Sequence, residues 1–161
     1  MIDRPFPELA VGQARVSRGR TLTETDVVNF CMLTGNWLEI HANEEFAKRA
    51  LFGRRVVQGS LVFSIVNALL PFDASVVAAF YGVDRLRFLA PSFIGDTVWA
   101  RSEIIALREK TPEAGVVTCE LVGANQRRER ILRCEFSLLI RAERLLPPDN
   151  DPFSSLESPT S

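Results

Sequence analysis

Residues 60–70, with the sequence SLVFSIVNALL, decide the fold that we expect for this chain. The stretch is apolar nearly all round, so it predicts a helix buried at the centre of the domain and ended by Pro71. Beyond Pro71 the apolar residues recur with period 2, which is typical of half-buried strands. The alternation is clearest between Cys134 and Ile140. We expect strands near residues 75–89, 97–109, 115–124 and 129–142.

The residues before this stretch predict two further helices. Residues 14–20 give a weak strand signal, and Thr23 then caps a helix whose first turn carries carboxylates. Gly35 and Asn36 end that helix, because both residue types tolerate the left-handed conformation of a C-cap. Asn43 begins a second, short helix. The side chains of this helix that are expected to face inward are Phe46, Ala47, Ala50 and Leu51.

Helices followed by antiparallel strands indicate an α+β domain, in which the sheet covers one long buried helix. A sheet wrapped around a single helix leaves an edge strand and an apolar rim exposed. We therefore expect the chain to pair through that edge into a homodimer or a higher homo-oligomer. The domain is expected to span residues 1–146, and the polar, proline-rich residues 147–161 predict a disordered tail. Residues 127–130, RRER, are expected to form a charged hairpin.

The composition argues against several classes of function. The chain has 161 residues, of which 47% are hydrophobic and 24% charged, a balance typical of one globular domain. A formal net charge of -1 gives no electrostatic reason to expect nucleic acid or an anionic membrane as the partner. We expect neither a secretory signal nor a membrane-spanning run. The three cysteines form no CxxC pair, so we expect buried thiols, no metal site and a reducing, cytoplasmic compartment.

The chemically most informative residues lie between the first predicted helix and the central one. Residues 34–41, TGNWLEIH, contain the only histidine of the chain, His41. Residues 52–61, FGRRVVQGSL, lead into the central helix. A histidine transfers protons near neutral pH, and the backbone N–H groups at a helix start stabilise negative charge. The arrangement therefore predicts a proton-transfer group that faces an oxyanion site.

Residues 34–61, TGNWLEIHANEEFAKRALFGRRVVQGSL, resemble the hydratase motif of the MaoC-like acyl dehydratases, a family that includes the (R)-specific enoyl-CoA hydratases. That motif is roughly S/T-G-D-x-N-P-x-H-x-D-x-x-F-A, followed by F-G-x-x-I-x-H-G-M/L. Residues 86–98, LRFLAPSFIGDTV, resemble the family's strand and its P-V-x-x-G-D turn, and the resemblance covers about residues 5–142. It implies a hot-dog fold, active sites at the interface of dimers or larger oligomers, and thioester substrates on CoA or a carrier protein.

The resemblance also implies roles for individual residues. By position in the motif, His41 is the general base for hydration of a 2-enoyl thioester, and the Gly59 N–H is the oxyanion donor. Asn36 stands at the position of the family's carboxylate, where an amide can hold a water but has no titratable proton near neutral pH. Leu38-Glu39 replaces the motif's Asn-Pro, and we hypothesise that Glu39 supplies the missing acid.

Further residues are candidates for substrate binding: Gln58, Ser60, Asn67, Arg54 and Arg55. Gln58 and Ser60 replace the second histidine and the Met or Leu of the motif. Asn67 lies in the central helix and needs a hydrogen-bond partner, either a backbone carbonyl or an active-site water. Arg54 and Arg55 either meet the phosphates of CoA or remain solvated. Apart from the CoA or carrier-protein thioester as substrate, no cofactor is expected.

Three functions remain open at this point. The first is a hydro-lyase that reversibly adds water to an enoyl thioester. The second is thioester hydrolysis, which would use the same oxyanion amide with a carboxylate-activated water. The third is a non-catalytic subunit that binds acyl thioesters or supports a catalytic partner chain, which Asn36 favours.

Overall fold

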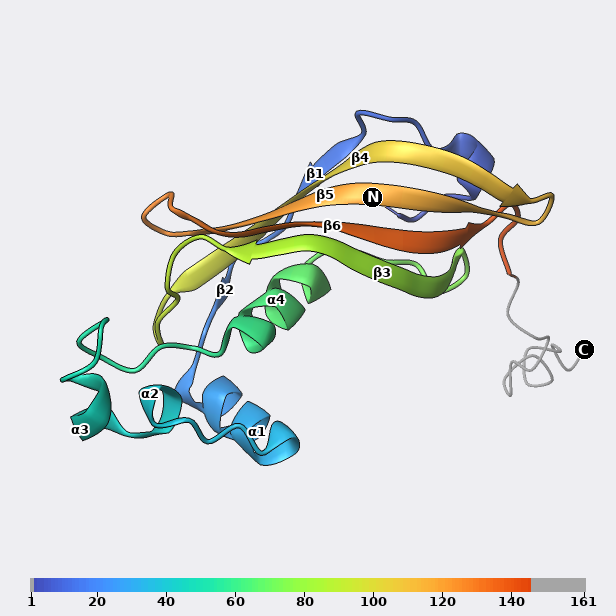
Figure 1. Cartoon of the computed structure of the whole chain (residues 1–161). Coiled ribbons are helices and arrows are strands. Elements are labelled where there is room, and N and C mark those ends of the chain that lie inside the picture. The colour runs from blue at the N-terminus through green and yellow to red at the C-terminus, as the bar shows by residue number, and fades with distance from the viewer. Residues whose placement is uncertain (1, 146–161) are drawn as a thin grey trace, which may run out of the picture.

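A computed structural model of the chain describes residues 2–145. One antiparallel sheet dominates it, with the strand order β1-β4-β5-β6-β3 and with β2 also paired to β4. The sheet curves around the buried helix α4, and helices α1, α2 and α3 gather at one end of the concave side (Figure 1). The strands are β1 (Ala14–Val16), β2 (Arg20–Thr21), β3 (Val77–Phe88), β4 (Thr97–Thr111), β5 (Ala114–Asn125) and β6 (Arg130–Arg141). The helices are η1 (Phe6–Glu8), α1 (Glu24–Thr34), α2 (Glu39–Ala42), α3 (Glu44–Ala47) and α4 (Gly59–Ala68).

The predicted central helix and strands are confirmed, and with them the α+β class. Helix α4 buries Leu61, Val62, Ile65 and Val66 against the sheet. Its opposite side, which carries Ser60, is exposed in the single chain, so burial covers one face of the helix and not its whole circumference. Each large apolar side chain transferred from water to this interface contributes about 1.5–3 kcal/mol to stability.

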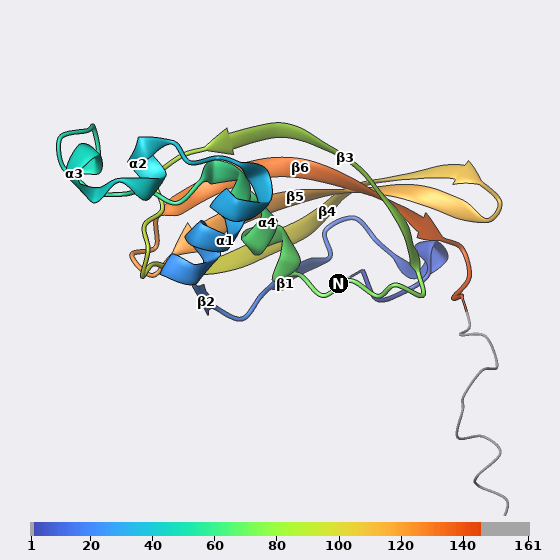
Figure 2. The same ribbon diagram turned by 90° about the horizontal axis from the view of Figure 1, so that it is seen from below.

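Helix α1 forms as the sequence predicts. The Thr23 hydroxyl accepts a hydrogen bond from the Asp26 N–H, and the Asp26 carboxylate accepts from the Thr23 N–H, which completes a capping box. Gly35 ends the helix with φ of 71°, in the left-handed region. The helix lies beside α4 on the concave side, and α2 and α3 extend beyond the sheet (Figure 2).

The second short helix begins at Asn43 as expected, but the prediction for its inner face is partly wrong. Ala47 is buried, whereas the Leu51 side chain is 88% exposed. The reason is that α3 ends at Ala47, so the chain turns before Leu51 and the helical spacing no longer applies. Phe46 is also exposed on this single chain.

The strand alternation and the thiol predictions are confirmed. In β6 the residues from Cys134 to Ile140 alternate between buried and half-buried. Cys31, Cys119 and Cys134 are free and buried. Within residues 2–145, no helix is both long and apolar enough to cross a membrane. The prediction of a disordered tail concerns residues 147–161, which lie outside the described residues.

Candidate active site

The single histidine lies in a one-turn helix that the sequence did not predict. His41 belongs to α2, and its side chain is buried with 7% exposure. The ring atom Nδ1 lies 2.7 Å from the backbone oxygen of Val56. A carbonyl oxygen can only accept a hydrogen bond, so Nδ1 must carry the proton. The neutral ring therefore keeps a free lone pair on Nε2, which is the form that a general base requires.

The Val56 backbone is itself fixed on several sides. Its N–H donates to the Ile40 carbonyl over 3.1 Å, and it forms an isolated antiparallel bridge with Phe93. The next residue, Val57, donates its N–H to the Ser92 carbonyl over 2.8 Å. These bonds tie α2, the segment before α4 and the loop after β3 into one unit. The orientation of the His41 ring is therefore set by backbone contacts that side-chain substitutions leave in place.

Gly59 is the first residue of α4. No side chain caps this end of the helix, so the first N–H groups of α4 have no side-chain acceptor. A Cβ atom at Gly59 would lie 2.9 Å from the Phe88 ring, too close for any other residue unless Phe88 moves. The positive end of the helix dipole lies at the same point, which favours negative charge there.

His41 and Gly59 line the same cavity, which has a volume of about 380 Å³. Its other walls come from the Phe52 loop, the segment before α4, the first turns of α4 and the loop after β3. The lining residues are His41, Phe52, Val56, Val57, Gly59, Val62, Phe88, Leu89, Ala90, Pro91 and Ser92. Most of these side chains are apolar, and none carries a carboxylate. The cavity therefore combines one proton-transfer group, one helix start and an apolar wall.

Neither residue expected to assist His41 lines this cavity. Asn36 is half-buried, and its backbone N–H donates to the Thr34 hydroxyl. The Glu39 side chain is exposed and accepts a hydrogen bond from the Asn43 amide over 3.2 Å. The hypothesis that Glu39 supplies the acid stays a prediction, and its position in the single chain gives that hypothesis no support.

The other three candidates near α4 also lie outside the cavity lining. Gln58 is buried, its Nε2 lies 3.0 Å from the Cys31 sulfur, and its Oε1 has no partner among residues 2–145. The Asn67 Oδ1 is likewise buried without a partner in the described chain. No hydrogen bond to a backbone carbonyl is found for Asn67 among these residues. Ser60 is exposed.

The two arginines before α4 are engaged elsewhere. Arg55 is ion-paired with Glu24 at 2.6 Å and with Glu44 at 3.1 Å, which ties the loop to α1 and α3. The hydrogen bonds that Arg55 donates to the Glu24 carboxylate raise the pKa of Arg55 above its ordinary value. The Arg54 guanidinium lies 3.6 Å from the centroid of the Phe93 ring, a cation–π contact. Contact with CoA phosphates stays a prediction for both residues.

Sequence reasoning missed the group that fixes the loop after β3. The buried Asp96 carboxylate accepts hydrogen bonds from the Phe93 N–H at 3.0 Å, from Gln126 at 2.8 Å and from Arg127 at 2.7 Å. Burial raises the pKa of Asp96, but the hydrogen bonds from Arg127, Gln126 and Phe93 lower it by more, so the net pKa is below its ordinary value. The Gly95-Asp96 turn in the sequence was the available signal.

Comparison with known proteins identifies relatives of this chain. Residues 8–125 match the model of the MaoC like domain. The chain is 40% identical to the protein MaoC of Klebsiella aerogenes over 98 residues, which are 60% of this chain but 29% of that protein. It is 32% identical to an (R)-specific enoyl-CoA hydratase of Rhodospirillum rubrum over 122 residues, covering 73% of this chain and 82% of the hydratase. The chain thus spans less than a third of the MaoC protein and most of the hydratase.

Solved structures agree with this relationship. A monoamine oxidase regulatory protein from Archaeoglobus fulgius superposes with a TM-score of 0.83 at 38% identity, covering 89% of this chain and 99% of that one. A double hotdog-fold protein of Mycobacterium tuberculosis superposes with a TM-score of 0.80 at 19% identity, over 98% of this chain and 51% of its own, which supports the fold alone. The predicted hot-dog fold is confirmed. By its sequence match and its fold, the chain belongs to the MaoC-like domain family.

Proposed function

We propose that this chain is a hydro-lyase that reversibly adds water across the double bond of a 2-enoyl thioester. The observation that supports this most is the shared cavity of His41 and Gly59, with the Nδ1 proton of His41 bound to Val56 and Nε2 left free. Its apolar walls suit an acyl chain. Relatives named as (R)-specific enoyl-CoA hydratase and 3-hydroxybutyryl-CoA dehydratase favour acyl-CoA over other thioesters, and a carrier-protein thioester is the alternative substrate.

In the proposed reaction His41 performs both proton transfers. Nε2 takes a proton from water while the water oxygen bonds to Cβ, and the π electrons of the double bond move toward the carbonyl. The Gly59 N–H donates to the resulting enolate oxygen, with the dipole of α4 behind it. The proton on Nε2 then passes to Cα, which restores the neutral ring. These proton transfers need no carboxylate, consistent with the absence of Asn36 and Glu39 from the cavity lining.

In this proposal the chain works as a homodimer or a larger homo-oligomer. β3 lies at one edge of the sheet, and its Phe80, Tyr81 and Phe88 side chains are about half exposed in the single chain. An edge strand with exposed aromatic side chains is a usual site of pairing. Phe88 also lines the cavity, so pairing along β3 would cover one wall of the site.

The test is the hydration of crotonyl-CoA, followed as loss of the conjugated enoyl absorbance, together with an assay for free thiol. We expect hydration by the native protein and no release of thiol. His41→Ala should lower kcat about 100-fold or more, since a positioned base contributes on the order of 10²–10⁴. Arg108→Ala, on the far end of β4, is the matched control and should leave the rate unchanged. Thiol release in place of hydration would instead assign a thioesterase.

The lack of a carboxylate in the cavity favours one second candidate, a non-catalytic subunit that binds acyl thioesters or supports a catalytic partner chain. The two functions differ in the response to Asn36→Asp. If the native protein has no hydratase activity and Asn36→Asp gains it, the chain has the non-catalytic role. An active native protein that loses its activity in His41→Ala assigns the hydro-lyase.

A further inference from the structure

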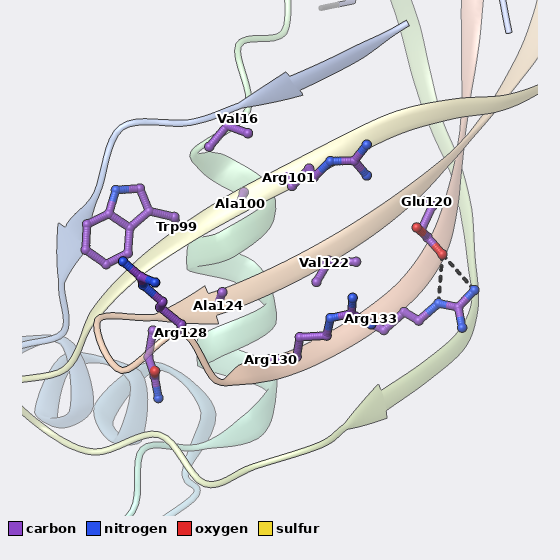
Figure 3. A pocket seen from close by; sticks show the side chains of 11 residues that line it. Val16, Trp99, Ala100, Arg101, Glu120, Val122, Ala124, Arg128, Arg130 and Arg133 are labelled. Carbon is purple, nitrogen blue, oxygen red and sulfur yellow. Dashed lines mark hydrogen bonds and ion pairs between the residues drawn. The ribbon is translucent and has the colours of Figure 1, made fainter. Parts of the chain in front are cut away.

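A second cavity, with a volume of about 640 Å³, lies on the convex face of the sheet, away from α4 (Figure 3). We call it the arginine groove. It is lined by Val16, Trp99, Ala100, Arg101, Glu120, Val122, Ala124, Asn125, Arg128, Arg130 and Arg133. Four of these residues are arginines and one is a glutamate, in a chain whose net charge is only -1. The groove is therefore more positively charged than the molecule as a whole.

A β-bulge brings two of the arginines to the same face. Residues three apart on a regular strand point to opposite faces of the sheet. The pairing of β5 with β6 shifts between Gly123 and Ala124, and Arg130 and Arg133 are both exposed while Ile131 between them is buried. Bulges commonly redirect side chains next to binding sites. Without this one, Arg130 would point away from the groove.

Arg128 also enters the groove through an unusual backbone conformation. Its φ is 63°, in the left-handed region that residues with a Cβ atom rarely adopt. The hairpin around it is fixed by Asn125, whose side chain accepts from the N–H groups of Arg127 and Glu129. Such strain persists only where surrounding contacts impose it, and it is frequent at ligand sites.

Two of the four arginines have no carboxylate partner. Arg101 is paired with Glu103 at 2.6 Å, and Arg133 with Glu120 at 2.7 Å. Among the residues that the structure describes, neither Arg128 nor Arg130 forms an ion pair. The groove thus offers two uncompensated guanidinium groups. Arg128 lies in the turn before β6 and points toward Trp99, and Arg130, the first residue of β6, points toward Val122 (Figure 3).

The floor of the groove is apolar and includes an aromatic ring. Val122 and Ala124 of β5 lie between Arg101 and Trp99 on one side and the β6 arginines on the other, as the strand register requires. The Trp99 ring packs on Gly19, where a Cβ atom would lie 2.7 Å from it. This contact holds the indole at the edge of the groove, beside Arg128 (Figure 3).

We propose that the arginine groove binds a nucleoside diphosphate. The base lies against Trp99 and Val122, and the two phosphates pair with Arg128 and Arg130, which supply charge-assisted hydrogen bonds in the fork geometry that phosphate prefers. A volume of about 640 Å³ is in the usual range for small-molecule sites. The lining residues include no histidine and no cysteine, so we expect the groove to bind its ligand without catalysing a reaction. The diphosphate that binds here belongs either to a free nucleotide or to the ADP group of CoA.

The test titrates ADP into the Trp37→Phe protein, in which Trp99 is the only tryptophan left. We expect quenching of its fluorescence with an affinity that weakens as salt rises. Arg128→Ala and Arg130→Ala should each weaken binding about tenfold, the value of one charge-assisted hydrogen bond, and Arg108→Ala should not. Adenosine and pyrophosphate should each bind far more weakly than ADP. If CoA binds more tightly than ADP, the ligand of the groove is the coenzyme. If ADP binds more tightly than CoA, the ligand is a free nucleotide.

Two results would overturn the proposal. One is the absence of ADP binding in a protein that is folded by circular dichroism. The other is equal affinity for ADP in the native protein and in the Arg128→Ala/Arg130→Ala double variant. If sedimentation shows that this double variant instead dissociates an oligomer, the groove is an interface between copies of the chain and the nucleotide proposal is wrong. Hydratase activity is measured separately and does not enter these outcomes.

Discussion

The cavity of His41 and the arginine groove lie on opposite sides of one sheet and differ in the groups that they offer. The concave cavity has apolar walls, one histidine and an uncapped helix start. The convex groove has four arginines and neither a histidine nor a cysteine. The first can therefore move protons on an uncharged acyl chain, while the second can only attract anions. Volume does not indicate chemistry, because the larger of the two cavities is the one without a histidine.

Among the variants that distinguish the two cavities, the loss of His41 should have the largest effect. His41→Ala should reduce kcat for crotonyl-CoA hydration about 100-fold or more, with a smaller change in KM, because the ring acts on the reacting atoms. The double variant Arg128→Ala/Arg130→Ala should keep the native kcat. A comparable loss of kcat in the two proteins would mean that the cavities are not functionally separate.

Gly59 gives the next largest effect. Gly59→Ala should lower kcat roughly 10- to 100-fold, because the new Cβ meets the Phe88 ring and displaces either the ring or the helix start. Phe88→Leu combined with Gly59→Ala makes room for the methyl group and should recover part of the rate. A native kcat in Gly59→Ala would contradict the expectation that the new methyl group displaces the ring or the helix start from its catalytic position.

A third variant tests whether the ion pair between Arg127 and Asp96 stabilises the loop after β3. Arg127→Ala leaves the buried Asp96 carboxylate without its ion pair and should lower the free energy of unfolding at neutral pH. The folded pKa of Asp96 lies below its ordinary value of 3.8, so its contribution to stability is complete above that pH. The contribution is lost as the pH falls through the folded pKa.

Urea unfolding at several pH values measures this effect. The native protein should lose stability more steeply below pH 4 than Arg127→Ala does, and Arg108→Ala should follow the native curve. Parallel curves for the native protein and Arg127→Ala would contradict the ion pair as the cause of the lowered pKa.

The smallest effects are expected at Glu39 and at the thiols. Glu39→Gln should change the hydration rate less than about twofold, since the side chain is exposed and outside the cavity. A large loss would revive Glu39 as the acid and would imply that a second copy of the chain brings it to the site.

Burial raises the pKa of the Cys119 thiol to about 12 and that of Cys134 to about 11. Both thiols should therefore resist labelling by a disulfide reagent at pH 8 until the protein is denatured. Because neither thiol lines either cavity, ligands at either one should leave the labelling rate unchanged. Fast labelling of the native protein would show that the sheet opens.

The features that sequence predicted are those set by local patterns. The Thr23 cap, the Gly35 stop and the period-2 strands depend on nearby residues, and all are found. Helix α2 has only four residues, too few for a helical period, so the environment of His41 had no local signal. Leu51 was predicted to face inward from a period that continued past the end of its helix.

Parts of the site depend on long-range backbone contacts. The tautomer of His41 is fixed by the carbonyl of Val56, and Val56 is fixed by Phe93, which is distant in sequence. A pattern of side chains carries no information on such bonds. The arginine groove was not predictable from the sequence for a related reason. The register shift at Ala124 changes the face of the sheet on which the β6 arginines lie, and side-chain patterns do not reveal such a shift. The run at 127–130 was predicted only as a charged hairpin, and the hairpin is found.

Gln58 has a consequence for engineering. It is fully enclosed, yet its amide oxygen has no partner within residues 2–145, which is an energetic cost that a hydrocarbon side chain of similar volume would not carry. Replacing it by methionine or leucine should therefore raise the melting temperature. The position directly before the helix start is thus the first place to look for a more thermostable variant of this protein.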